Sequence, residues 1–105
     1  MRTTRRSGQK ITGQKLTIAE LQKHIRDRYA KVDRKRGWPK TFAYFIEEVG
    51  ELATALADGK DRANLEEEFA DVIAWLCTLA NITDVDLADS IARKYLSKSR
   101  PKGHK

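Results

Sequence analysis

Two acidic clusters separated by a short turn signal constrain the fold of this chain more than any other feature. The clusters read Glu47-Glu48-x-x-Glu51 and Glu68-x-x-Asp71. Residues three or four apart are neighbours on the surface of an α-helix, so each cluster predicts carboxylates on one face of a helix. Residues 58–61 (Asp-Gly-Lys-Asp) are typical of a helix end, a short loop and a new helix start. A loop that short predicts that the two helices lie antiparallel and side by side.

The spacing of the clusters also predicts which carboxylates face each other. In an antiparallel hairpin, residues at the same level have numbers with a constant sum. Glu51 and Glu68 form one such pair, and Glu48 and Asp71 form another with the same sum, about 5 Å further along the axis. Four carboxylates this close repel one another and raise their own pKa values. Solvated surface acids would explain one cluster, but two clusters in register favour a cation site, and all-oxygen ligands favour Mg²⁺ or Mn²⁺ over zinc.

The charge of the chain is unevenly distributed. The formal net charge is +6, yet residues 1–16 and 97–105 contain basic side chains and no acidic ones, whereas residues 17–96 hold all 15 acidic residues. We expect a flexible basic arm over 1–16, a helical domain over 17–98 and a basic tail over 99–105. One cysteine excludes an intramolecular disulfide, and neither a membrane span nor a signal peptide is evident, so a cytoplasmic protein is expected.

Apolar residues at helical spacing predict four helices and therefore an all-α fold. A capping box at Thr17 and Glu20 starts the first helix and Gly37 ends it; a second follows Trp38-Pro39, and the third covers about 63–81. The apolar faces expected for the second and third helices are Phe42, Phe45, Ile46, Val49, Ala53 and Leu56, and Leu65, Phe69, Val72, Ile73, Leu76 and Leu79. The fourth helix is expected to start within 83–86, with Leu87, Ile91 and Tyr95 facing inward.

The third helix contains a run, residues 72–80, that is apolar nearly all round. Such a helix is buried on more than one side. A four-helix chain of 105 residues has little else to cover it, so we expect a bundle completed by oligomerisation. Cys77, within the run, is expected to be a small buried hydrophobe.

The acidic motifs resemble the signature of the MazG-type nucleotide pyrophosphohydrolases, members of the all-α NTP pyrophosphatase superfamily. That signature is E-E-x-x-E, a variable spacer, and E-x-x-D. The resemblance covers about residues 17–95 and extends to Thr41-Phe42 ahead of EEVGELATAL and to the stretch EFADVIAWLCTLANI. It implies Mg²⁺-dependent hydrolysis of nucleoside triphosphates to monophosphate and pyrophosphate by a homodimer or a dimer-based tetramer. Neither a membrane nor nucleic acid is expected as a partner, because no membrane span is evident and the basic charge lies in the tails.

The resemblance also implies roles for individual residues. The metal ligands would be Glu48, Glu51, Glu68 and Asp71. Glu47 would orient or deprotonate the attacking water, and Lys94 resembles a lysine that family members place near the phosphates, although Ser97 stands where many members have asparagine. Trp75 follows Asp71 by one turn and is placed to stack on a base; core packing explains it about as well.

Three other functions are compatible with parts of the pattern. Phosphoribosyl-ATP pyrophosphohydrolases share the acidic architecture, and a dimeric dUTPase-like specificity is a second alternative. A helical nucleic-acid-binding protein using its basic tails is the alternative from a different class, because such charge supports salt-sensitive binding. The last reading leaves the aligned carboxylates unexplained.

Overall fold

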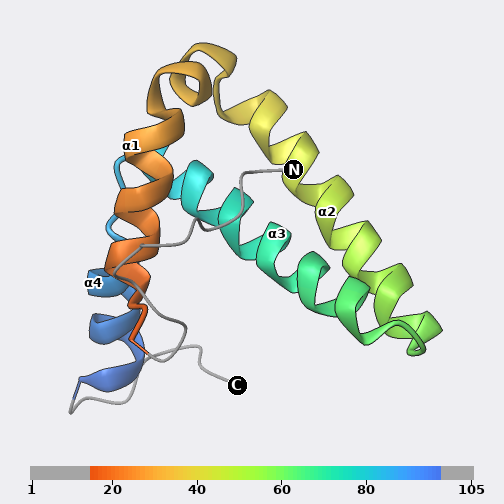
Figure 1. The fold of residues 1–105 in the computed structure, drawn as a ribbon. Helices are drawn as coiled ribbons and strands as arrows, with labels where there is room; N and C mark the ends of the chain where they lie inside the picture. The colour runs from red at the N-terminus through yellow and green to blue at the C-terminus, as the bar shows by residue number, and fades with distance from the viewer. Residues whose placement is uncertain (1–14, 98–105) are drawn as a thin grey trace.

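A computed structural model describes residues 15–97 of the chain, and Figure 1 shows their arrangement. The elements are α1 (Ile18–Arg36), α2 (Trp38–Asp58), α3 (Arg62–Ile82), α4 (Leu87–Ile91) and a final π-helical turn, η1 (Ala92–Leu96). No strand occurs within 15–97, so the predicted all-α, four-helix fold is confirmed. The expected basic arm and tail fall almost entirely on residues outside this range. None of the helices described is long and apolar enough to cross a membrane.

The two longest helices, α2 and α3, form the predicted antiparallel hairpin (Figure 1). The other large helix contact joins α1 to α3, whereas α1 meets α2 mainly at the corner that connects them. The short helix α4 lies beside α1 rather than beside α2. The hairpin therefore has α1 against one of its two helices, and much of α2 has no partner helix other than α3.

Local signals in the sequence set the helix ends. The capping box at the start of α1 is formed: the backbone N–H of Glu20 donates to Thr17 Oγ1 at 3.0 Å, and the Thr17 N–H donates to Glu20 Oε1 at 2.8 Å. Gly37 and Gly59, which follow α1 and α2, have φ values of 85° and 67°, a region that favours glycine because it lacks Cβ. Asp61 then caps α3 by accepting from the Asn64 N–H.

The expected apolar faces of α2 and α3 are not a core within one chain, which corrects the sequence-based expectation. The large apolar residues of these faces that are exposed are Phe42, Ile46, Val49 and Leu56 in α2, and Phe69, Ile73 and Leu76 in α3. The reason is that α2 and α3 meet along a different line, on which the rings of Tyr44 in α2 and Trp75 in α3 are in contact. Periodicity located the apolar stripes correctly but could not tell which neighbour they face. Cys77 is fully buried, as expected.

The fourth helix is shorter than expected. Asp84 adopts a positive φ of 59°, which breaks the chain direction, and α4 begins only at Leu87, with Asp86 as its cap. After Ile91 the chain continues as the π-helical turn, and both Ile91 and Tyr95 are at least 40% exposed, so neither faces inward. Of the three expected inward positions, Leu87 alone is half-buried.

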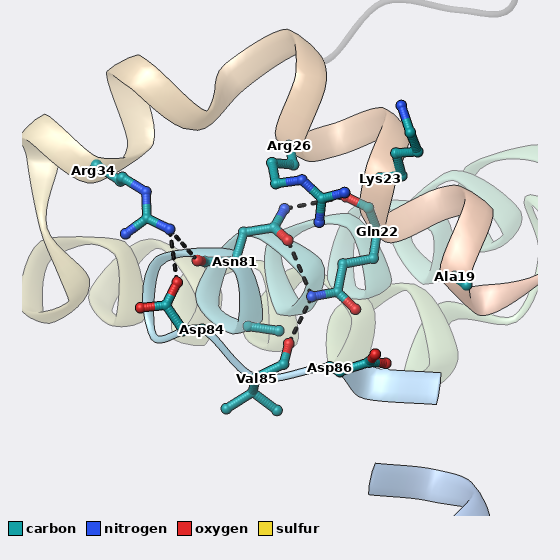
Figure 2. Close-up of a pocket in the computed structure, with 10 residues that line it drawn as sticks. Ala19, Gln22, Lys23, Arg26, Arg34, Asn81, Asp84, Val85 and Asp86 are labelled. Atoms are coloured by element: carbon teal, nitrogen blue, oxygen red, sulfur yellow. Dashed lines mark hydrogen bonds and ion pairs between the residues drawn. The ribbon is translucent and has the colours of Figure 1, made fainter. Parts of the chain in front are cut away.

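A buried polar joint ties α1, the end of α3 and the start of α4 together (Figure 2). The side-chain amide of Gln22 donates to Asn81 Oδ1 at 3.0 Å and to the Val85 carbonyl at 2.7 Å, while Gln22 Oε1 accepts from the Leu87 N–H at 3.0 Å. Asn81 returns a hydrogen bond to the Gln22 carbonyl at 3.2 Å. Both side chains are more than 90% buried, so these bonds satisfy groups that would otherwise be costly to bury.

We therefore predict that Gln22→Met lowers the free energy of unfolding by about 1–3 kcal/mol, because Asn81 and two backbone groups lose their partner. Thermal unfolding monitored by circular dichroism measures the effect. Lys23→Met is the matched control, since the neighbouring Lys23 is exposed and makes only a surface ion pair with Asp27. Equal melting temperatures for the two variants would contradict the prediction.

Candidate metal and nucleotide site

Three carboxylates come together between α2 and α3, midway along the hairpin. Glu48 of α2 and Glu68 and Asp71 of α3 each offer an oxygen atom, and these atoms lie within 4.8 Å of one another. The constant-sum register predicts the pairing of Glu48 with Asp71, whereas it pairs Glu68 with Glu51, which is not among the three. Asp71 is the most buried of the three, with 9% of its surface exposed.

One oxygen of each of these carboxylates has no hydrogen-bond partner. Glu48 Oε1, Glu68 Oε1 and Asp71 Oδ1 are buried and unpaired in the part of the chain that the structure describes. Buried polar atoms are almost always hydrogen-bonded in folded proteins, so three unpaired acceptors that converge need an explanation. A bound hard cation would satisfy all three, because it takes carboxylate oxygens as ligands. The donor set therefore fits a divalent metal ion.

The three carboxyl groups of the cluster are harder to ionise than free carboxyl groups. The pKa of Glu48 is raised above its ordinary value of 4.5, first by burial and then by the negative charges of Glu51, Asp71 and Glu68. Burial also raises the pKa of Glu68, with Glu51 and Asp71 adding to the effect. The pKa of Asp71 is raised in the same direction, again chiefly by burial. All three groups would ionise more easily beside a cation.

The other two predicted acids lie at the edge of this group. Glu51 is exposed, and its charge acts on both Glu48 and Glu68, which places it near the cluster but outside the closest set of oxygens. Glu47 is also exposed and is the weakest of the charges that raise the pKa of Glu48. The structure thus gathers three of the four predicted ligands and leaves Glu51 and Glu47 beside them.

An aromatic pair continues the register one helical turn from the carboxylates. Tyr44 of α2 and Trp75 of α3 have the same number sum as Glu48 and Asp71, and their rings meet edge to face with centroids 5.6 Å apart. Each aromatic residue is half-buried. Trp75, which sequence reasoning placed near the substrate, therefore lies in the layer next to the acids and packs on Tyr44.

Sequence reasoning missed a polar corner that adjoins this pair. The Arg36 guanidinium donates to Thr41 Oγ1 at 2.8 Å and to Asp33 Oδ1 at 2.6 Å. It also lies 5.1 Å from the ring centroid of Trp75 and 5.8 Å from that of Tyr44. In the sequence Arg36 reads only as part of a basic helix end. The signal that was available is the register, which pairs Tyr44 with Trp75.

Lys94 is not brought to the carboxylates by the described fold. It is exposed in η1, where its ammonium lies 5.5 Å from the Tyr95 ring centroid. The preceding helix, α4, packs against α1. Among the described residues, the charges that act on Glu48 and Glu68 are all acidic.

A separate hollow of about 450 Å³ lies at the joint of α1 with the end of α3 (Figure 2). None of the predicted site residues lines it. Arg34, one of its two arginines, donates to the Asn81 carbonyl and to Asp84 Oδ1, both at 2.9 Å. These bonds and the Gln22 joint give its polar lining a structural role.

Comparison with known families agrees with the geometry of the hairpin. A family model described as the MazG nucleotide pyrophosphohydrolase domain matches residues 38–101, more than half of the chain. The chain belongs to the MazG family. It is accordingly a nucleotide pyrophosphohydrolase, a hydrolase acting on phosphoric anhydrides. The matched span contains every acidic residue of the cluster, whereas α1 lies before it. A search of the curated proteins finds no match.

The strained cluster leads to a prediction about pH. A raised carboxyl pKa means that the folded state holds its proton more tightly than the unfolded state, so this contribution to stability is present at low pH. It is lost as the pH rises from about 4, where unfolded carboxyls ionise, through the raised pKa values. We expect Asp71→Asn to keep the shape of the site and to remove part of the loss of stability that occurs as the pH rises. Without metal, the melting temperature at neutral pH should therefore be unchanged or higher.

Thermal unfolding in a chelating buffer at several pH values measures this effect. Glu66→Gln is the control, because Glu66 is an exposed acid of α3 that pairs only with Arg62, at 3.5 Å. If Asp71→Asn lowers the metal-free melting temperature at every pH, the carboxylate is a stabilising structural group and the prediction is wrong.

Proposed function

We propose that the protein hydrolyses nucleoside triphosphates to the monophosphate and pyrophosphate, with Mg²⁺ as its cofactor and Mn²⁺ as a substitute. The observation that carries this proposal is that Glu48, Glu68 and Asp71 each bring a carboxylate oxygen within 4.8 Å of the others. Each of these carboxylates also has a buried oxygen without a hydrogen-bond partner among the described residues. A triphosphate is itself negative, so carboxylates can hold it only when a cation lies between them.

Four residues of this chain would hold the ion. Glu48, Glu68 and Asp71 offer the convergent oxygens, and Glu51 stands at the rim, close enough for its charge to act on all three. When bound, the ion would neutralise charge on the phosphates and acidify bound water. The contribution of the chain is to fix the carboxylates on two rigid helices, so that no rearrangement is needed when substrate arrives.

The remaining predicted residues have distinct roles in this proposal. Glu47 is exposed beside Glu48, and its carboxylate is assigned to orient the attacking water and accept its proton. Trp75, in the layer next to the acids, is assigned to the nucleoside side of the substrate. Lys94 is assigned to the phosphates; because α4 packs on α1, reaching them requires a change in η1 or a second copy of the chain.

We further propose that the protein is a homo-oligomer, with a dimer as the smallest form, and that it acts in the cytoplasm. The exposed apolar side chains of α2 and α3 form the basis for the first statement, since monomers seldom leave so many large apolar residues uncovered. The sequence has a single cysteine, Cys77, which is buried, and this suits a reducing compartment.

The proposed reaction can be tested by its product, pyrophosphate. With Mg²⁺, at least one nucleotide from a panel that includes dUTP and phosphoribosyl-ATP should yield pyrophosphate, and chelation should stop the reaction. Glu48→Gln should lower turnover by about 100-fold or more, as loss of a principal electrostatic group does in other active sites. The exposed Glu66→Gln should retain activity. Release of orthophosphate, or no turnover of any panel member by the parent protein, would refute the assignment.

The proposed assembly has a separate test. Light scattering at micromolar concentration should give at least twice the monomer mass, and Ile46→Asp or Ile73→Asp should reduce it because each places a charge in the apolar face. Val32→Asp in α1 is the control, since Val32 is 63% exposed and lies outside that face. A parent protein with monomer mass would contradict the proposal.

A further inference from the structure

The Arg36 guanidinium is held in place more firmly than a surface arginine. Its Nε donates to Thr41 Oγ1 and one Nη2 hydrogen goes to Asp33 Oδ1. Thr41 is fully buried and itself donates to the Gly37 carbonyl at 2.7 Å, and the Asp33 side chain is only 3% exposed. Two flat faces, Tyr44 and Trp75, lie within 6 Å of the guanidinium. The group is therefore preorganised, while its own side chain remains 16% exposed.

Its distance from the carboxylates suits a substrate group other than the metal-bound phosphates. Tyr44 precedes Glu48 by one turn and Thr41 precedes it by nearly two, which places the guanidinium about 6–10 Å along α2 from the cluster. A nucleotide extends at least this far from its phosphates to its base. A substrate held at the acids and directed toward Arg36 thus brings its nucleoside to the aromatic layer.

The charge of the corner favours an uncharged group over a phosphate. Asp33 neutralises Arg36, so the pair presents hydrogen-bond donors with little net charge. Within residues 15–97, the guanidinium Nη1 makes no hydrogen bond, which leaves donors of a planar fork for a ligand. Aromatic faces beside a planar donor fork match a nucleobase, because a base has a π-face and acceptor atoms on its edge.

Resting on the function proposed above, we propose that Arg36 contacts the substrate base and sets the base preference of the enzyme. Its donors fit a base edge with two adjacent acceptors, which guanine has at O6 and N7 and cytosine has at O2 and N3. Adenine has no two adjacent acceptors, because N1 and N7 each lie beside the N6 amino donor and N3 stands alone. Uracil separates its two carbonyls by an N–H. Arg36 lies outside the span that the family model matches, as expected of a determinant particular to this chain.

The test compares the four bases with matched variants. Arg36→Lys keeps the charge beside Asp33 but removes the fork, and the pair Asp33→Asn with Arg36→Gln keeps polar side chains without leaving a buried charge unpaired. Lys35→Met is the control, because Lys35 is the exposed basic residue next to Arg36 at the end of α1. The measurements are kcat and KM for GTP, CTP, ATP and UTP, and for methyl triphosphate, which has no base.

We expect the parent to favour guanine and cytosine by about tenfold or more in kcat/KM, a typical size for one bidentate base contact. Both Arg36 variants should lose this preference mainly through a rise in KM, and should hydrolyse methyl triphosphate as the parent does. The Lys35 control should keep it. An equal loss of kcat/KM on all substrates, including methyl triphosphate, would show that Arg36 supports the fold or binds the phosphates. No change in kcat/KM would show that Arg36 does not contact the substrate. Either result overturns the inference.

A binding measurement separates this inference from the proposed reaction. The monophosphates GMP, CMP, AMP and UMP are titrated while the fluorescence of Trp75 is followed in a Trp38→Phe background. If the parent turns over no nucleotide yet binds GMP and CMP better than AMP and UMP, and Arg36→Lys abolishes the difference, the reaction is wrong and the base contact stands. If the parent releases pyrophosphate but the variants keep its base preference in both assays, the contact is wrong and the reaction stands. Absence of both turnover and binding overturns both.

Discussion

Mutual repulsion between carboxylates that two helices hold together is the constraint on which this structure depends. Glu48, Glu68 and Asp71 occupy the seam between α2 and α3, where most helix pairs place apolar side chains. Burial and like charge both raise the pKa of Glu48, which means that folding works against its ionised form. The rest of the hairpin must therefore supply the contacts that keep the seam closed. The unpaired carboxylate oxygens are the atoms that a bound cation would satisfy.

The hairpin is fixed from both of its ends, and this is what sets the register of the acids. At one end, Gly59 turns the chain with a positive φ and Asp61 restarts the helix as its cap. At the other end, the short corner at Gly37 joins α1 to α2, and α1 packs along α3. A shift of one residue along α2 would break these contacts and rotate the acids away from each other, because neighbouring residues differ by about 100° around a helix.

The sequence was sufficient to predict the features that depend on neighbouring residues or on residue numbers across the hairpin. Caps, glycine turns and the pairing of Glu48 with Asp71 follow from spacing alone, and the same count would have paired Tyr44 with Trp75. It was insufficient where two surfaces of one helix compete for the same neighbour. The stripe that includes Ile46 is the more apolar side of α2, yet the side with Tyr44 and Glu48 faces α3. The role of Arg36 was hidden for a related reason, since its partners come from three helices.

The orientation of α2 has a consequence that links assembly to chemistry. If α2 and α3 met through their apolar stripes, the acids would lie on the outside of the hairpin. They would then be solvated and would not be held close together. Turning the acids inward instead leaves the apolar side chains, such as Ile46 and Ile73, facing water. The free energy that a monomer would gain by burying them is then available only from another molecule. On the proposed assembly, covering this face would stabilise the hairpin whose seam the carboxylates strain. Dilution should therefore weaken the fold and the site together, because the same contact supports both.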